Sequence, residues 1–254
     1  MYVQRIECKF TNDVLLKEIS EVFSYYLSSL RMNGQVCGRE WPLYRDGDAV
    51  SSVVLTPEEV SLAQSFNTSY ANQHLLKLDG LGCTVTVVQT AEDLQGAAAC
   101  ACAARSAYVL YTNYVSLESP VRCLDCFDPV PLYRLPPMRN GEFHELICWQ
   151  SDYQSCDSLQ MNGATLEAAS LRQISQLDSS LSVSGLIHCR TLQQATKTPF
   201  YYYLYRHHGR SRVAERKRCC PQCGKPWLLD QTLHDLFDFK CDTCHLLSNI
   251  ALDV

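Results

Sequence analysis

The sequence is poor in charge and has no long apolar run. Asp, Glu, Lys and Arg make up 19% of its 254 residues, below the roughly 25% typical of soluble domains. Apolar residues make up 46%, which excludes an intrinsically disordered chain. No apolar stretch approaches the roughly 18 residues of a membrane span, and residues 1–7 lack the apolar core of a signal peptide. We therefore expect a soluble, cytoplasmic protein with no membrane partner.

Cysteine, in contrast, is abundant. The chain has 15 cysteines, an odd number, and the missing signal peptide argues against a disulfide framework. In a reducing compartment, clustered cysteines more often hold metal. Eight of them lie in or beside pairs: Cys100/Cys102, Cys123/Cys126, Cys220/Cys223 and Cys241/Cys244. We expect the other seven to be small buried hydrophobes: Cys8, Cys37, Cys83, Cys148, Cys156, Cys189 and Cys219.

The hydrophobic pattern predicts an α+β (or α/β) N-terminal and central region. Apolar residues at three- and four-residue steps indicate a helix over 13–31, and Thr56-Pro57-Glu58-Glu59 has the form of a helix start that runs to about Tyr70. Further helices are expected in the Ala-rich stretch before residue 108 and over 164–177. The expected strands are 2–10, 50–55, 84–88, 108–114, 143–149 and 199–206.

The same pattern and the cysteine spacing suggest four parts. Residues 1–115 form an α/β-type domain, and 116–205 form a second α+β segment packed on it. Residues 206–218 are a basic linker, and 219–254 are a small C-terminal zinc ribbon.

The C-terminal cysteines carry the strongest motif. Cys220 and Cys223 are followed, after seventeen residues, by Cys241 and Cys244, a spacing within the window of zinc sites. Two residues between cysteines let one tight turn aim two thiolates at one ion, and two such turns complete a tetrahedron. We expect one structural zinc, since four cysteines leave no open coordination position. A redox pair is the alternative, and Cys219 could compete with Cys220 as ligand.

Several segments resemble a bacterial family of uncharacterised proteins. That family is described as containing a zinc ribbon and, by inference from the ribbon, as binding nucleic acid. The resemblance is most specific in the tail and spans roughly 119–254. It is carried by Cys220–Trp227, Phe237–Cys244, Leu246–Ala251, Ser119–Cys126, Pro131–Pro136, Cys156–Met161 with Asn162, and Pro199–Tyr205. It implies a zinc ion in the tail and a nucleic-acid partner.

Cys123 and Cys126 form half of a second metal site. A closed site would need two more ligands, and the candidates are His144, Cys148, Cys156, His188 and Cys189. None of these forms a second pair at ligand-turn spacing, so a reduced structural pair and a redox pair remain open.

A basic tract precedes the tail. Residues 206–218 hold six basic residues against one acid, a net charge of +5, whereas residues 1–205 hold 14 bases and 21 acids, a net of −7. The basic residues could contact phosphates: Arg206, Arg210, Arg212, Arg216, Lys217 and Arg218. Beside them, Tyr201, Tyr203 and Tyr205 share one strand face and could stack bases. A solvated linker and a central buried strand are the alternatives.

These features favour a non-enzymatic zinc-ribbon protein that binds nucleic acid. The alternative is a cytoplasmic immunity or inhibitor protein whose acidic surface binds a basic toxin, such as a nuclease. No nucleophile, phosphate-loop or metalloprotease motif supports an enzyme, and no small-molecule substrate is indicated.

Overall fold

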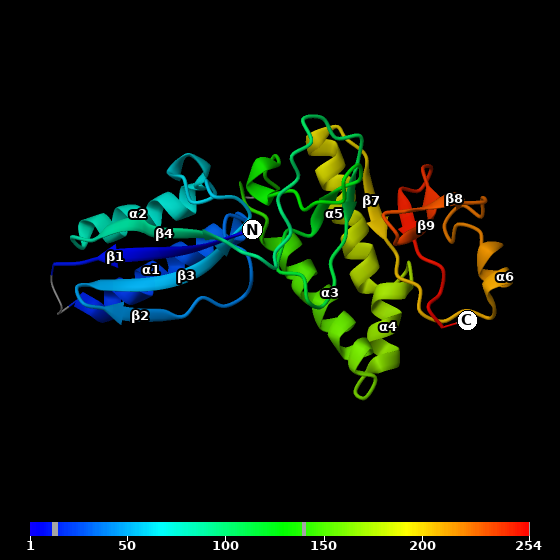
Figure 1. Ribbon diagram of the computed structural model, residues 1–254, viewed down its shortest axis with the longest axis horizontal. Coiled ribbons are helices and arrows are strands. Elements are labelled where there is room, and N and C mark those ends of the chain that lie inside the picture. The colour runs from blue at the N-terminus through cyan, green and yellow to red at the C-terminus, as the bar shows by residue number, and fades with distance from the viewer. Residues whose placement is uncertain (12–14, 139–140, 254) are drawn as a thin grey trace. The chain divides into compact units, whose positions relative to one another are not determined.

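The computed structural model describes residues 1–11, 15–138 and 141–253 (Figure 1). The chain divides into two compact units. The first comprises Met1–Ala99, Leu117–Ser119 and Asp128–His144, and the second comprises Cys100–Ser116, Pro120–Phe127 and Glu145–Val254. Within the described residues, no helix combines the length and the apolar character needed to cross a membrane.

In the described part of the first unit, four antiparallel strands form a sheet of order β2-β3-β1-β4. The strands are β1 (Tyr2–Lys9), β2 (Leu43–Asp46), β3 (Ala49–Thr56) and β4 (Thr84–Glu92). Figure 1 shows β1 between β3 and β4. Helices α1 (Leu16–Met32) and α2 (Ser69–Gly80) complete the unit. Residues of both helices and of β1 and β3 share one apolar core.

Helix α1 forms where the sequence predicts it. Its buried residues recur at three- and four-residue steps, including Ile19, Phe23, Leu27 and Leu30, so one face of the helix packs into the core. The expected helix began at residue 13, and residues 12–14 lie outside the described ranges.

The prediction of a helix that starts at Thr56 is wrong. Thr56 ends β3, and its hydroxyl accepts a hydrogen bond from Gln4 at 3.1 Å. Gln4 also donates to the carbonyl of Glu59, and the carboxylate of Glu58 accepts hydrogen bonds from Tyr133 and Arg134. The next α-helix is α2, where the Thr68 hydroxyl caps the amide of Ala71. Long-range contacts thus override a local helix signal.

In the second unit, the described strands form a sheet of order β6-β5-β7-β10-β9-β8. They are β5 (Tyr108–Leu110), β6 (Val121–Cys123), β7 (Phe200–Tyr203), β8 (Leu228–Leu233), β9 (Phe237–Cys241) and β10 (Leu246–Ser248). Strand β7 pairs in parallel with both β5 and β10, and the remaining pairs are antiparallel. The C-terminal strands therefore continue the sheet that begins at β6.

The described helices of the second unit are α3 (His144–Asn162), α4 (Glu167–Ser175), α5 (Ser180–Thr196) and the short α6 (Arg212–Arg216). Helix α5 packs on β7, where Gly185 admits the ring of Tyr202: a Cβ at Gly185 would lie 2.3 Å from a ring carbon. Helix α4 confirms the helix expected over 164–177.

Two further expectations for secondary structure are wrong. The strand expected over 143–149 is the start of α3, whose buried face mixes Leu146, Trp149 and Tyr153 with polar Gln154 and Asp157. The Ala-rich stretch before residue 108 contains no helix in the described chain. Both segments matter for the sites below, because the second contains Cys100 and Cys102.

Candidate metal centre

Four cysteines of the second unit converge near the C-terminus. We call Cys220, Cys223, Cys241 and Cys244 the C-terminal quartet. Their sulfurs all lie within 4.8 Å of one another, and the Cys223 and Cys241 sulfurs are 3.7 Å apart. Four thiolates at about 2.3 Å from one zinc ion would be about 3.8 Å apart at the corners of a tetrahedron. A disulfide would require about 2.05 Å. The donor set and its spacing therefore fit a single metal ion.

Local backbone geometry aims the first pair of sulfurs. Gly224 has a φ of +71°, and its amide donates to the Cys220 carbonyl at 2.9 Å. The Cys220 amide in turn donates to the carbonyl of Lys225 at 2.9 Å. The backbone amide of Lys225 also donates to the Cys223 sulfur and lowers the pKa of that thiol to about 7. The turn thus favours the thiolate, which is the form that binds metal.

Strands β9 and β10 position the second pair. Cys241 is the last residue of β9, and the turn that contains Cys244 leads into β10. On β9, Phe237 and Phe239 are fully buried, and the Trp227 ring packs 5.1 Å from that of Phe239. The turns are therefore anchored to a packed sheet.

The two nearest competitors lie outside the quartet. Cys219 is exposed, and its sulfur faces the carbonyl of Lys217 at 3.9 Å. The ring of His245 packs against Tyr201 at 5.2 Å. Neither belongs to the group of converging ligand atoms found in the described residues.

The basic tract divides into two kinds of residue. Arg206 and Arg218 both approach Glu215, which is buried, at 2.9 Å and 3.5 Å. The Arg218 guanidinium also donates to the Asn249 carbonyl and lies 4.4 Å from the centroid of the Phe239 ring. Burial lowers the pKa of Arg218 to about 10, so it remains charged at neutral pH. These two arginines hold the tract to the sheet.

The other four cations of the tract are exposed. They are Arg210, Arg212, Arg216 and Lys217, and three of them lie on or beside α6. The Ser211 hydroxyl caps this helix by accepting from the amide of Ala214, while Glu215 faces inward. The helix therefore turns its acid to the core and leaves its basic residues at the surface. Close to it, Arg206, Arg218 and Gln222 help to line a pocket of about 620 Å³.

The tyrosines of β7 lie in the core. All four residues of the strand are buried, and Tyr201 and Tyr203 belong to an apolar cluster with Phe237. The prediction that these two rings stack on bases is wrong, because both are buried and β7 is a central strand with neighbours on both sides. Tyr205, beyond the strand, is half-buried.

The structure brings Cys123 and Cys126 together with Cys100 and Cys102. We call these four residues the second quartet. The ligands that the sequence analysis expected beside Cys123 and Cys126 are wrong. None of them belongs to a converging group in the described chain, and all lie on α3 or α5: His144, Cys148, Cys156, His188 and Cys189. The missed signal is the spacing, since Cys102 and Cys123 are separated by twenty residues, which is within the zinc window.

The cysteines outside both quartets differ in burial. Cys8, Cys83 and Cys189 are buried as expected, and Cys37 and Cys156 are half-buried. Cys148 and Cys219 are exposed, so for these two the expectation of burial is wrong. Burial raises the pKa of Cys8 to about 12, so this thiol stays protonated.

Sequence comparison finds close bacterial relatives. An uncharacterised protein of Haemophilus influenzae is 38% identical over 237 residues, which cover 91% of both chains. A second uncharacterised protein of that organism is 45% identical over 143 residues, 56% of this chain and 70% of the other. Residues 1–92, 102–205 and 209–254 match three domains of unknown function (DUF8589, DUF2310 and DUF8594).

Comparison with solved structures finds distant likeness. Rv0793 from Mycobacterium tuberculosis has a TM-score of 0.30 and 13% identity, covering 37% of this chain and 100% of that chain. SnoaB, a cofactor-independent oxygenase from Streptomyces nogalater, has a TM-score of 0.29 and 11% identity, covering 37% of this chain and 94% of that chain. Likeness at this level carries no information on activity.

Proposed function

The chain belongs to the family of the two uncharacterised Haemophilus influenzae proteins, and we propose that it is a non-enzymatic zinc-ribbon protein that binds nucleic acid. In this proposal the C-terminal quartet holds a structural zinc ion. A zinc ion with four thiolate ligands has no open position for substrate or water, so its contribution is to stability. The basic tract then makes the contacts to the ligand.

The observation that carries the proposal is the split within the basic tract. Two arginines fasten α6 to the sheet through buried Glu215, and four cations remain exposed around it. Exposed Lys and Arg held on a fixed element are the groups that neutralise nucleic-acid phosphates. The neighbouring pocket adds a concave surface of a size that could receive a nucleotide.

Charge along the chain localises the proposed contact. Residues 219–254 contain two bases against five acids, a net charge of −3, and residues 1–205 have a net of −7. Phosphates would therefore be repelled by most of the chain and attracted by residues 206–218. We propose that the tract, and not the cysteine turns themselves, contacts nucleic acid.

Gel-shift titrations at two salt concentrations test the proposal. With four phosphate contacts, a plot of the logarithm of the binding constant against the logarithm of the salt concentration should have a slope of about −2.8 on single strands and about −3.6 on duplex. Replacing the four exposed cations of the tract by Gln should weaken binding to all sequences about equally, since phosphate contacts carry no sequence information. A matched control replaces four exposed cations elsewhere: Lys9, Lys77, Arg172 and Arg190.

The alternative, an acidic protein that neutralises a basic partner, rests on the net charge of residues 1–205. It predicts no gel shift even at low salt, where electrostatic binding is strongest. It also predicts that the change of the four tract cations leaves complex formation intact, whereas reversing acids in residues 1–205 slows association.

A further inference from the structure

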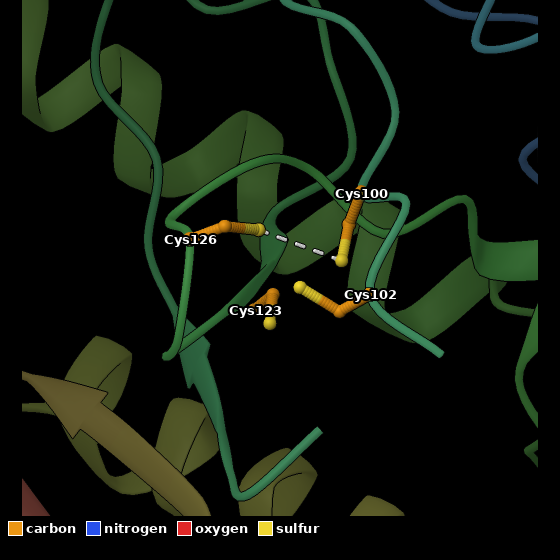
Figure 2. A group of neighbouring side chains, drawn as sticks. All are labelled: Cys100, Cys102, Cys123 and Cys126. Carbon is orange, nitrogen blue, oxygen red and sulfur yellow. Dashed lines mark hydrogen bonds between the residues drawn. The ribbon is translucent and has the colours of Figure 1, made fainter. Parts of the chain in front are cut away.

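The second quartet lies outside the site on which the proposed function rests. We propose that Cys100, Cys102, Cys123 and Cys126 hold a second structural zinc ion, in a C-x-C and C-x2-C arrangement. Figure 2 shows the four side chains pointing toward one another from two segments of the chain. The chain would then bind two zinc ions where the sequence analysis expected one.

The sulfur positions match those of the C-terminal quartet. All four sulfurs lie within 4.8 Å of one another, and the Cys100 and Cys126 sulfurs are 3.5 Å apart. That distance is close to the edge of about 3.8 Å that a tetrahedral zinc-thiolate site requires. It is well beyond a disulfide bond. A disulfide or a redox pair would also give no reason for the other two sulfurs to converge.

The backbone of the second quartet repeats a feature of the C-terminal turns. In each C-x2-C turn, the residue after the second cysteine has a positive φ: Phe127 at 66°, Gly224 at 71° and His245 at 52°. The amide of Phe127 donates to the Cys123 carbonyl at 2.9 Å, as the amide of Gly224 does to Cys220. A bulky residue such as Phe rarely adopts this conformation. The strain at Phe127 therefore points to a turn held for its sulfurs.

The two segments are also held together by polar contacts. The Asp125 carboxylate accepts hydrogen bonds from both the amide and the hydroxyl of Ser106. The Leu124 amide donates to the Ala107 carbonyl at 2.9 Å. The Arg105 guanidinium donates to the Cys100 sulfur at 3.2 Å, which places a positive charge beside the thiolates. Four thiolates around one Zn²⁺ carry a net charge of −2, which this arginine partly offsets.

The metal would add to the contacts that hold a segment without regular secondary structure. Residues 93–107 contain no helix or strand in the described chain. A helix could not serve, because side chains two residues apart on a helix do not face each other, whereas Cys100 and Cys102 must meet at one ion. The proposed zinc clips this segment to Cys123 at the end of β6.

Contacts also join the second quartet to the hairpin that leads to Cys241. His234, between β8 and β9, has its Nε2 atom 2.7 Å from the Leu124 carbonyl, and its ring stacks on Phe127 at 5.1 Å. Leu124 and Phe237 belong to the same apolar cluster. Each of the two proposed zinc ions would thus be held by a cysteine at the end of a strand of the same sheet, Cys123 of β6 and Cys241 of β9.

Zinc counting on the full chain tests the proposal. Native mass spectrometry of the wild type should show two zinc ions per chain, Cys126→Ser should show one, and the control Cys148→Ser, an exposed cysteine outside both quartets, should show two. Cys223→Ser should also show one, which separates this site from the C-terminal quartet.

Alkylation of the wild-type chain decides the matter even if the variants do not fold. With zinc bound, the thiols of the second quartet should resist a thiol reagent, and removal of the metal by a chelator should expose them. One zinc per chain, with Cys100, Cys102, Cys123 and Cys126 alkylated equally fast before and after chelation, would overturn the proposal. Iron at this site would overturn its assignment to zinc, because four tetrahedral sulfurs also suit iron.

Discussion

The substitution Glu215→Gln tests whether the buried acid holds the basic tract in place. Glu215 is 3% exposed and faces two arginines. Gln preserves the size of the side chain and removes its charge. Arg218, whose side chain is 18% exposed, would then be a largely buried cation without its carboxylate.

The expected cost follows from the burial of each partner. Breaking a buried ion pair by removing one partner costs about 3–5 kcal/mol, because the remaining charge stays desolvated. The lower end applies here. The side chain of Arg206 is 39% exposed and can reach solvent, and Arg218 keeps its hydrogen bonds to Ser248 and Asn249. We expect the free energy of unfolding of the second unit to fall by about 3 kcal/mol.

Urea unfolding followed by tryptophan fluorescence measures this change, since Trp227 lies 5.0 Å from the Arg218 guanidinium. With a slope of about 1–3 kcal/mol per molar urea, the midpoint should fall by about 1–3 M. The control Asp253→Asn breaks an exposed contact with His208 and should cost less than about 1 kcal/mol. An equal, small effect of both substitutions would refute the role given to Glu215.

Three further predictions concern the second unit. Cys220→Ser should remove one zinc ion per chain, measured by metal analysis, and lower the melting temperature, measured by calorimetry. Structural zinc contributes on the order of 10–16 kcal/mol of apparent binding energy in small peptides. The adjacent Cys219→Ser should change neither the zinc content nor the melting temperature. Gly185→Ala should destabilise the chain by about 1–3 kcal/mol in urea, because the new Cβ would overlap the Tyr202 ring; a gain from the better helix propensity of Ala would contradict this packing. Burial lowers the pKa of His188. Stability that is present above its unfolded pKa of about 6.5 should therefore be lost as pH falls toward the folded pKa, because only the unfolded chain takes up the proton. If His188→Gln shows the same loss of stability between pH 7 and pH 5 as the wild type, this residue does not contribute.

Local chemistry explains which features the sequence predicts. Cys220 and Cys223 form their turn with Gly224, and the second pair follows at a spacing that two turns need, so their convergence is predictable from residue types alone. Strand β7 is equally readable, because Phe200–Tyr203 are apolar on both faces and therefore suit a central strand. In both cases the signal lies within a few neighbouring residues.

The missed features depend on contacts between distant residues. Thr56, the expected helix cap, is paired with Tyr2 in the sheet, and Glu58 pairs with Arg134, seventy-six residues away. Helix α3 buries Gln154 and Asp157, which bond to Thr112 and to the amide of Tyr114. Polar residues on a buried face break the apolar period by which a helix is recognised.

The second quartet was hidden for a related reason. The Ala-rich composition around Cys100 and Cys102 favours a helix, on which side chains two residues apart do not face each other. The hydrogen bonds of Arg105 to the Cys100 sulfur and of the Ser106 amide to Asp125 are contacts that the sequence does not reveal. Propensity is a weak prior where tertiary contacts, and in our proposal a metal ion, can override it.

Anomalous diffraction from a crystal of the full chain, at the zinc absorption edge, tests the central claim most directly. The account predicts a peak about 2.3 Å from each sulfur of Cys220, Cys223, Cys241 and Cys244. A map with no peak among these sulfurs, or electron density for disulfides between them, would contradict it.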